Sequence, residues 1–218
     1  STHCISSAAS DVYKRQGMWA LFAGSFEKHL TVEFDLTAGQ AKDVAARAKK
    51  KYREIIAKLP EFDKRDRFEM NIVNCAMLAA FILCMPQRPD IKTLTDYYAA
   101  AMMTPTMKAF CRASGKKKFT PKDIEGMKAT AKLRAGDRNP YSWNMDFFEY
   151  ENGSGYEARF TTCGICTLMQ VLGLYDLTPA LCHLDYTMSD AGGASDFVRE
   201  YTLASGGPYC DCGYHKKQ

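Results

Sequence analysis

Apolar residues recur at the spacing of a helix face in the first half of the chain. Between Gln40 and Leu59, small and apolar side chains return every three or four positions, with lysines and arginines between them. This period is typical of an amphipathic helix. Thr37 and Gln40 fit a capping box at its start, and Pro60 would stop it. We therefore expect a helix over residues 40–59.

Three further helical segments are expected before residue 139. The pattern predicts a helix over residues 66–84, and its most apolar stretch should be buried in the core. Another helix should begin near Thr93, and Pro105 must break or kink it. Thr120 and Pro121 then provide an N-cap and a proline at the first helical position, so a helix should follow to about Leu133.

After Pro140 the hydrophobic period changes to two, which indicates strands. The pattern predicts strands over residues 143–150 and 156–162 and helices over residues 165–172 and 179–189. Two further strands should follow over residues 197–203 and 209–215. Each strand pair has a turn sequence between its members and should form a hairpin. Thr178 should open the second helix. The expected fold is α+β, with a helical part (residues 17–138) followed by an antiparallel sheet of about four strands with two helices packed on it (residues 139–218).

Residues 1–16 are expected to lie outside this single domain. The run from Ser6 to Gln16 reads SSAASDVYKRQ, which is the in-frame translation of a transposase adapter used in shotgun sequencing. Such a segment is excluded from reasoning about the fold. Genuine sequence would then begin at Gly17 or Met18, and the native residues that preceded it would not be defined by this sequence.

Composition and charge narrow the class of protein. The formal net charge of +4 suits a small anionic ligand but is too low for a nucleic-acid-binding surface. The longest apolar run is shorter than a membrane span, so we expect no membrane insertion. A chain of 218 residues can build its own core, so its nine cysteines indicate reduced thiols in a cytoplasm better than a disulfide framework. The glycine pairs lack a phosphate-binding pattern, and we expect no cofactor.

The last third of the chain concentrates residues that can carry chemistry. Cys182 and Asp185 are three residues apart on the expected helix 179–189, so a thiol and a carboxylate should share one face. Arg199 should point inward from its strand and therefore needs an anion, which is either a protein carboxylate such as Asp185 or Glu200 or the carboxylate of a ligand. Residues 116–118 are three lysines, which read as a solvated loop or a phosphate contact.

A bound metal is the competing interpretation of the cysteines. Cys163 and Cys166 have the spacing of zinc ligands, and Cys210 with Cys212 could complete a four-thiolate site. Because the second pair has only one intervening residue on a strand, where structural zinc sites usually have a turn, we favour a metal-free protein.

A series of motifs in this region matches one known family. The motifs are Trp143; Cys163-Gly164-Ile165-Cys166; Gly173 to Pro179; Cys182 with Asp185; Arg199; Thr202-Leu203; Gly206; and Cys210-Asp211. In this order they resemble the L-2-amino-thiazoline-4-carboxylic acid hydrolase family. Two positions depart from that pattern, since Cys212 replaces a usual Phe and Asp176 a frequent Glu.

The resemblance implies hydrolytic opening of a small carboxylated cyclic amidine to a carbamoyl amino acid. It implies Cys182 and Asp185 as catalytic residues, and the substrate bound by Arg199, Thr202, Cys210, Asp211 and Trp143. Either Cys182 or a water activated by Asp185 could be the nucleophile, and we favour water because no histidine is placed to activate the thiol. A non-catalytic ligand-binding or sensor domain is the main alternative, and a cysteine-held metal module is the third.

Overall fold

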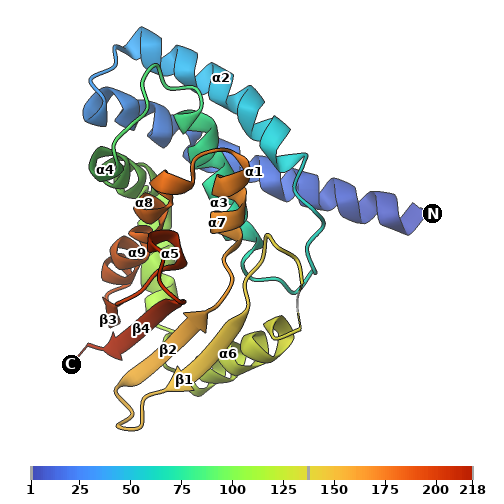
Figure 1. Cartoon of the computed structure of the whole chain (residues 1–218), viewed down its shortest axis with the longest axis vertical. Coiled ribbons are helices and arrows are strands. Elements are labelled where there is room, and N and C mark those ends of the chain that lie inside the picture. Colours follow the sequence, from blue (N-terminus) through green and yellow to red (C-terminus); the bar gives the residue numbers. More distant parts are fainter. Residues whose placement is uncertain (1, 137, 218) are drawn as a thin grey trace.

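The chain forms helices first and a sheet afterwards, as the sequence predicts. The computed structural model describes the backbone of residues 2–136 and 138–217, and the side chains of residues 17–136 and 138–217. The first part contains α1 (Thr2–Glu33), α2 (Ala38–Ile56), α3 (Glu69–Ile82), α4 (Ile91–Met102), α5 (Pro105–Gly115) and α6 (Pro121–Arg134). The second part contains β1 (Met145–Glu149), β2 (Gly155–Phe160), α7 (Gly164–Val171), α8 (Thr178–Cys182), α9 (Leu184–Gly192), β3 (Ser195–Val198) and β4 (Cys210–Lys216). The α+β prediction is confirmed (Figure 1).

The helix boundaries follow the caps that the sequence indicated. At the start of α2, Thr37 Oγ1 accepts a hydrogen bond from the Gln40 backbone N–H, and Gln40 Oε1 accepts one from the Thr37 N–H. Thr120 caps α6 ahead of Pro121. Pro105 does break the preceding helix and becomes the first residue of α5, whose cap is Thr104. Local capping chemistry therefore sets these ends.

Helix α3 lies in the middle of the main core. Its residues from Ala76 to Phe81 are almost fully buried on all sides, so this stretch of the helix has no polar face. Helices α1, α2 and α7 pack against it, and Trp19 and Phe26 of α1 contact Phe81 through their rings. No helix among the described residues has the length and apolarity that a bilayer crossing requires.

Helix α1 was not predicted, and it runs through the segment assigned to the adapter. It begins at Thr2, and its N-terminal end extends away from the rest of the molecule (Figure 1). Among the side chains that the structure describes in this helix, Trp19 packs on the core and Phe22, Phe26 and Leu30 are buried. The backbone of residues 2–16 is helical, while the place of residues 1–16 outside the domain and their origin as a translated adapter stay predictions.

Deleting residues 1–16 should leave thermal unfolding almost unchanged, because the side chains that anchor α1 lie beyond this segment. The melting temperature of the shortened protein, measured beside that of the full chain, is the direct test. A decrease of more than about 4 °C, which is at least 1 kcal/mol for a domain of this size, would show that the segment stabilises the fold.

The four strands form one antiparallel sheet in the order β1-β2-β4-β3. Gly153, with a φ of 68°, lies in the turn between β1 and β2, as the hairpin prediction required. Met145, Ala158, Phe197 and Cys212 form a small core on one face of this sheet. Residues of α6 and α9 pack against that core. Helix α9 lies within the predicted helix 179–189, but the other helix expected on the sheet, over residues 165–172, packs against α3 as α7, and α6 covers the sheet in its place.

Two predicted elements are wrong in their extent. The helix expected over residues 179–189 is divided into α8 and α9 at His183, and Thr178 lies inside α8 without a capping hydrogen bond. The strand expected over residues 197–203 ends at Val198. Beyond it, the Asp211 side chain accepts hydrogen bonds from the backbone N–H groups of Glu200 and Tyr201, and these contacts replace strand pairing.

A buried ion pair joins the loop before α3 to the end of α6. Arg134 Nη1 lies 2.8 Å from Asp66 Oδ2, and the two side chains are 2% and 1% exposed. Ser142 Oγ donates a hydrogen bond to the same oxygen, and the Phe68 N–H donates one to Asp66 Oδ1. Three segments distant in sequence therefore meet at one carboxylate.

Helices α5 and α9 are in direct backbone contact. A Cβ atom placed on Gly115 would lie 2.2 Å from the carbonyl oxygen of Gly192. Because no side chain fits at that distance, only glycine at position 115 allows the two helices to approach this closely.

Candidate active site

A cavity of about 230 Å³ lies where the helical part meets the sheet. Residues of α3, α4, α5, α7, α8, α9, β2 and β4 line it. Most of the lining is apolar or aromatic, as at Met102 and Phe160, with a few polar groups among them. The volume is below the roughly 300–1,000 Å³ typical of sites for drug-sized ligands. The cavity therefore suits a small molecule.

Arg199 is the cation of this cavity. Its Nη2 lies 2.5 Å from Asp185 Oδ2, and the same nitrogen donates to Cys212 Sγ at 2.9 Å. Its Nη1 donates to the backbone carbonyl of Cys182 at 2.9 Å. The side chain is only 6% exposed. Burial acts to lower the pKa of Arg199, but Asp185 and Cys212 together outweigh burial and raise it. The guanidinium therefore stays charged, and it holds Asp185 and α8 in place.

Asp185 is the more accessible member of this ion pair. It lies in the first turn of α9, and its side chain is 43% exposed. The sequence allowed either a protein carboxylate or a ligand carboxylate as the partner of Arg199, and the structure shows the protein carboxylate of Asp185 in contact with it. Because Asp185 also borders the cavity, a ligand can contact its free carboxylate edge.

Cys182 borders the cavity next to this pair, as predicted from its spacing to Asp185. Burial raises the pKa of its thiol, and the neighbouring Cys163 raises it further. The Arg199 cation acts to lower this pKa, but it is already paired with Asp185 and does not outweigh burial. Cys182 is therefore a neutral thiol at neutral pH.

Cys163 has the opposite character. It is the N-cap residue of α7, although its side chain makes no capping hydrogen bond, and a position at a helix N-terminus lowers the pKa of a thiol. The Cys166 thiol, the N–H groups of Ile165 and Cys166, and the Trp143 indole N–H all lower the pKa of Cys163 against the effect of burial. Cys166, as a donor to Cys163, has its own pKa raised. Cys163 thus differs from Cys182, Cys210 and Cys212, whose pKa values are raised.

The structure brings most of the predicted site residues together. Trp143, Cys182, Asp185, Arg199 and Cys210 all border the one cavity. Cys163 and Cys212, which the sequence placed in an alternative metal site, border it too. Burial raises the pKa of Cys210, and that of Cys212 to about 12, so both are neutral thiols in the wall.

Thr202 and Asp211 lie outside this cavity. Thr202 caps the short 3-10 helix Leu203–Ser205 through a hydrogen bond from the Ser205 N–H. Asp211 holds the segment after Arg199 through its two backbone contacts. Both residues therefore support the loop that carries Arg199 and are not positioned to touch a ligand in the cavity.

The arrangement of the thiols disfavours a metal centre. Among the described residues, no three His, Cys, Asp or Glu side chains are grouped as a metal site requires. The Cys166 thiol lowers the pKa of Cys163 and has its own pKa raised, and burial raises the pKa of Cys210 and Cys212. A thiol must lose its proton to become a ligand.

We accordingly expect the purified protein to contain no stoichiometric zinc, and a chelator to leave its thermal unfolding unchanged. Elemental analysis and melting curves with and without chelator provide the measurement. One zinc ion per chain, lost together with the fold, would instead assign Cys163, Cys166, Cys210 and Cys212 as its ligands.

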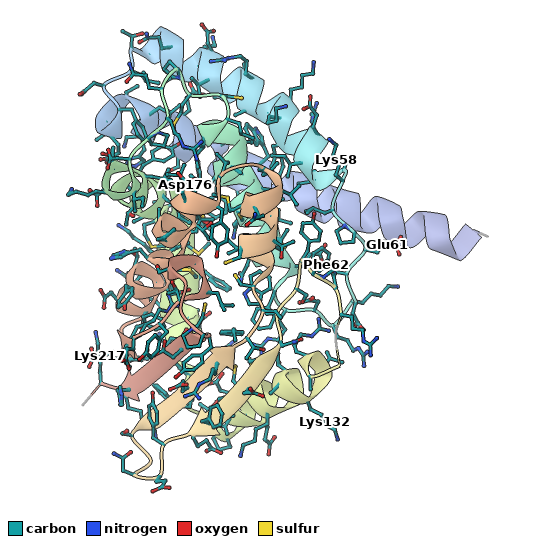
Figure 2. All side chains as sticks on the ribbon, in the orientation of Figure 1. Lys58, Glu61, Phe62, Lys132, Asp176 and Lys217 are labelled. Atoms are coloured by element: carbon teal, nitrogen blue, oxygen red, sulfur yellow. The ribbon has the colours of Figure 1, made fainter. Side chains whose placement is uncertain are left out.

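Lys118 is largely buried, whereas a solvated loop was expected over residues 116–118. Lys58, Lys132 and Lys217 lie at the outside of the molecule, as most lysines do (Figure 2). Lys118, by contrast, is largely buried, with its Nζ 3.2 Å from the centroid of the Tyr214 ring. Burial lowers the pKa of Lys118 to about 8. It borders a second cavity of about 290 Å³, which meets the first at Asp185, Met188 and Tyr214.

Sequence reasoning missed the lowered pKa of Cys163 because it weighed the Cys-x-x-Cys pair only as metal ligands. The signal that could have revealed it was the position of Cys163 directly before the predicted helix 165–172, where the first backbone N–H groups are free to bind an anion. The indole of Trp143, twenty residues earlier in the sequence, gave no comparable signal.

One comparison with known proteins gives a match. The model of the L-2-amino-thiazoline-4-carboxylic acid hydrolase family matches residues 65–214, a range that includes every residue lining the cavity of about 230 Å³. No curated protein and no solved structure matches the chain.

Proposed function

The chain belongs to the L-2-amino-thiazoline-4-carboxylic acid hydrolase family, and on that premise we propose that it opens a small carboxylated cyclic amidine of the 2-aminothiazoline-4-carboxylate type. The reaction adds water at the ring carbon between sulfur and nitrogen, breaks the carbon–sulfur bond and leaves a carbamoyl amino acid. The observation that supports this proposal is the Asp185–Arg199 pair at the edge of a small apolar cavity.

Asp185 is proposed to act on the amidine. A cyclic isothiourea carries positive charge when protonated, and a carboxylate beside it both balances that charge and accepts a proton as the nucleophile adds. The half-exposed side chain of Asp185 leaves one edge of the carboxylate for these contacts, while Arg199 holds the other.

Arg199 is proposed to bind the substrate carboxylate in addition to holding Asp185. Its Nε is buried and has no hydrogen-bond partner among the described residues. A guanidinium has five N–H donors in a planar fork, so contacts with the protein do not exhaust it. A substrate with a carboxylate and an amidine at opposite ends matches the two charges of the pair.

The direct test is turnover of L-2-aminothiazoline-4-carboxylate by the purified chain, followed by mass spectrometry of the carbamoyl product. The matched control substrate is 2-aminothiazoline, which has the ring but no carboxylate, and it should react far more slowly. If the protein binds carboxylated heterocycles but turns over none of them, the sensor alternative replaces the hydrolase.

Arg199→Lys should raise the KM for the carboxylated substrate by roughly tenfold, the effect of losing about one hydrogen bond to a charged group. An ammonium cannot reproduce the planar, multi-point contact of a guanidinium. Steady-state kinetics with both ring compounds measure this effect. An equal loss of activity toward 2-aminothiazoline would show that Arg199 acts only by holding Asp185.

A further inference from the structure

We propose that the second cavity, of about 290 Å³, binds an anionic arm of the substrate, so that the preferred ring compound carries a second carboxylate on its exocyclic nitrogen. The inference rests on the proposed function and specifies its substrate class. In this arrangement the ring and its own carboxylate occupy the cavity that Asp185 and Arg199 border. The arm extends into the second cavity, where Lys118 binds its carboxylate.

Lys118 borders the second cavity with an ammonium group that has no protein anion beside it. Its Nζ lies 3.2 Å from the centroid of the Tyr214 ring, and 5.6 and 5.8 Å from those of Tyr156 and Phe119. Within the described part of the chain, its side chain forms neither an ion pair nor a hydrogen bond. Ring faces attract a cation, but an ammonium also has three N–H donors. An anion in the cavity can therefore bind it.

The charged residues that line this cavity leave one positive charge without a partner. Arg67 donates a hydrogen bond to the Thr130 hydroxyl at 3.2 Å and forms no ion pair with the residues that the structure describes. Asp185 is already paired with Arg199, so Asp123 is the other carboxylate of the lining. Two cations thus face one carboxylate. An excess of one charge matches a carboxylate better than a phosphate ester, which carries nearly two negative charges.

The loop that carries Lys118 is fixed in one conformation. Phe119 has a φ of 62°, which is uncommon for a residue with a bulky side chain. Asp123 Oδ2 accepts hydrogen bonds from the Phe119 N–H at 2.9 Å and from the Tyr156 hydroxyl at 3.2 Å. Backbone strain of this kind persists where neighbouring contacts hold it, and it is frequent at ligand sites. Asp123 therefore holds the loop, while Lys118 is left for a ligand.

The second cavity meets the first where the proposed function places the amidine. Asp185, Met188 and Tyr214 border both cavities. An amidine beside Asp185 can keep one N–H on its exocyclic nitrogen for the carboxylate and carry a substituent on the same nitrogen. That substituent lies at the junction, where the flexible side chain of Met188 can adjust to it. A short carboxyalkyl chain thus leads from the ring toward Lys118.

The experiment compares derivatives of L-2-aminothiazoline-4-carboxylate that differ only in the arm on the exocyclic nitrogen. The N-carboxyethyl compound carries the second carboxylate, and the N-carbamoylethyl compound has the same size without the charge. Calorimetry with the full chain measures their dissociation constants, and steady-state kinetics measure KM. We expect the carboxyethyl compound to bind about tenfold more tightly, the effect of one hydrogen bond to a charged group. Tighter binding of an N-phosphonoethyl compound would overturn the assignment to a carboxylate.

Lys118→Met should abolish the preference for the charged arm, because it keeps most of the alkyl chain and removes the ammonium. Lys117→Met is the matched control, since it removes the same charge from an exposed neighbour that does not border the cavity. It should retain the tenfold preference. Equal loss in both variants would show that the surface charge of the loop attracts the arm, and the inference would be wrong. Should Lys118→Met fail to fold, the comparison of the two arms in wild type decides.

Turnover of the parent compound separates this inference from the proposed function. If wild type opens the parent ring but binds the two matched arms equally, the arm site is wrong and the hydrolase stands. If wild type opens no ring but binds the carboxyethyl compound more tightly through Lys118, the hydrolase fails and the carboxylate site remains. Absence of binding for every compound would reject both.

Discussion

Asp185→Asn should slow ring opening by roughly 10²-fold or more. The substitution keeps the shape of the side chain and one acceptor for Arg199, but it removes both the base and the negative charge that balances the amidinium. Because Arg199 then lacks its counter-charge beside the substrate, the loss should appear mainly in kcat. Single-turnover rates at saturating substrate measure it without interference from product release.

Asp190→Asn is the matched control, since Asp190 lies on the same helix with an exposed side chain and only a distant contact to Lys217 at 3.9 Å. It should have nearly normal kinetics. Near-normal turnover by Asp185→Asn itself, with every cyclic amidine tested, would remove this carboxylate from the mechanism.

Asp66→Asn should destabilise the protein by about 3–5 kcal/mol, which is the usual cost of removing one partner of a buried ion pair. The carboxylate is the acceptor for Arg134 and Ser142, and both charged side chains are almost fully covered. Without it the buried Arg134 charge loses this ion pair. We expect the melting temperature to fall by at least about 6 °C.

Asp63→Asn provides the comparison three residues away, because Asp63 pairs with Arg65 on the surface. Exposed pairs contribute about 0–1 kcal/mol, so this variant should unfold almost as wild type does. Equal melting temperatures for the two variants would mean that the buried pair stabilises no more than the exposed one.

Most of the fold was predictable because its signals are local. The capping box at Thr37, the proline at position 121 and the turn around Gly153 each define a boundary within a few residues of sequence. The limits of such signals are visible at Val198, where β3 ends because Asp211, a residue of another strand, takes up the next two backbone N–H groups.

The candidate site was predictable only in part, because some of its features follow from local spacing and others depend on residues distant in sequence. The pairing of Cys182 with Asp185 follows from helical spacing, and the two still meet although His183 divides the helix. The environment of Cys163 depends on Trp143, and the burial of Lys118 depends on Tyr214. Contacts between residues so far apart in sequence are formed by packing, and no local pattern encodes them.

The Gly115–Gly192 contact sets a limit on how the substrate range of this protein can change. Met107 of α5 and Met188 of α9 both border the cavity, so the distance between these helices fixes part of its width. The two helix backbones are in direct contact where they cross, so a larger residue there would push the helices apart. Such a change would disturb the packing of both helices as well as widen the cavity. Selection for bulkier rings should therefore replace flexible lining residues such as Met107 and Met188, and leave the two glycines in place.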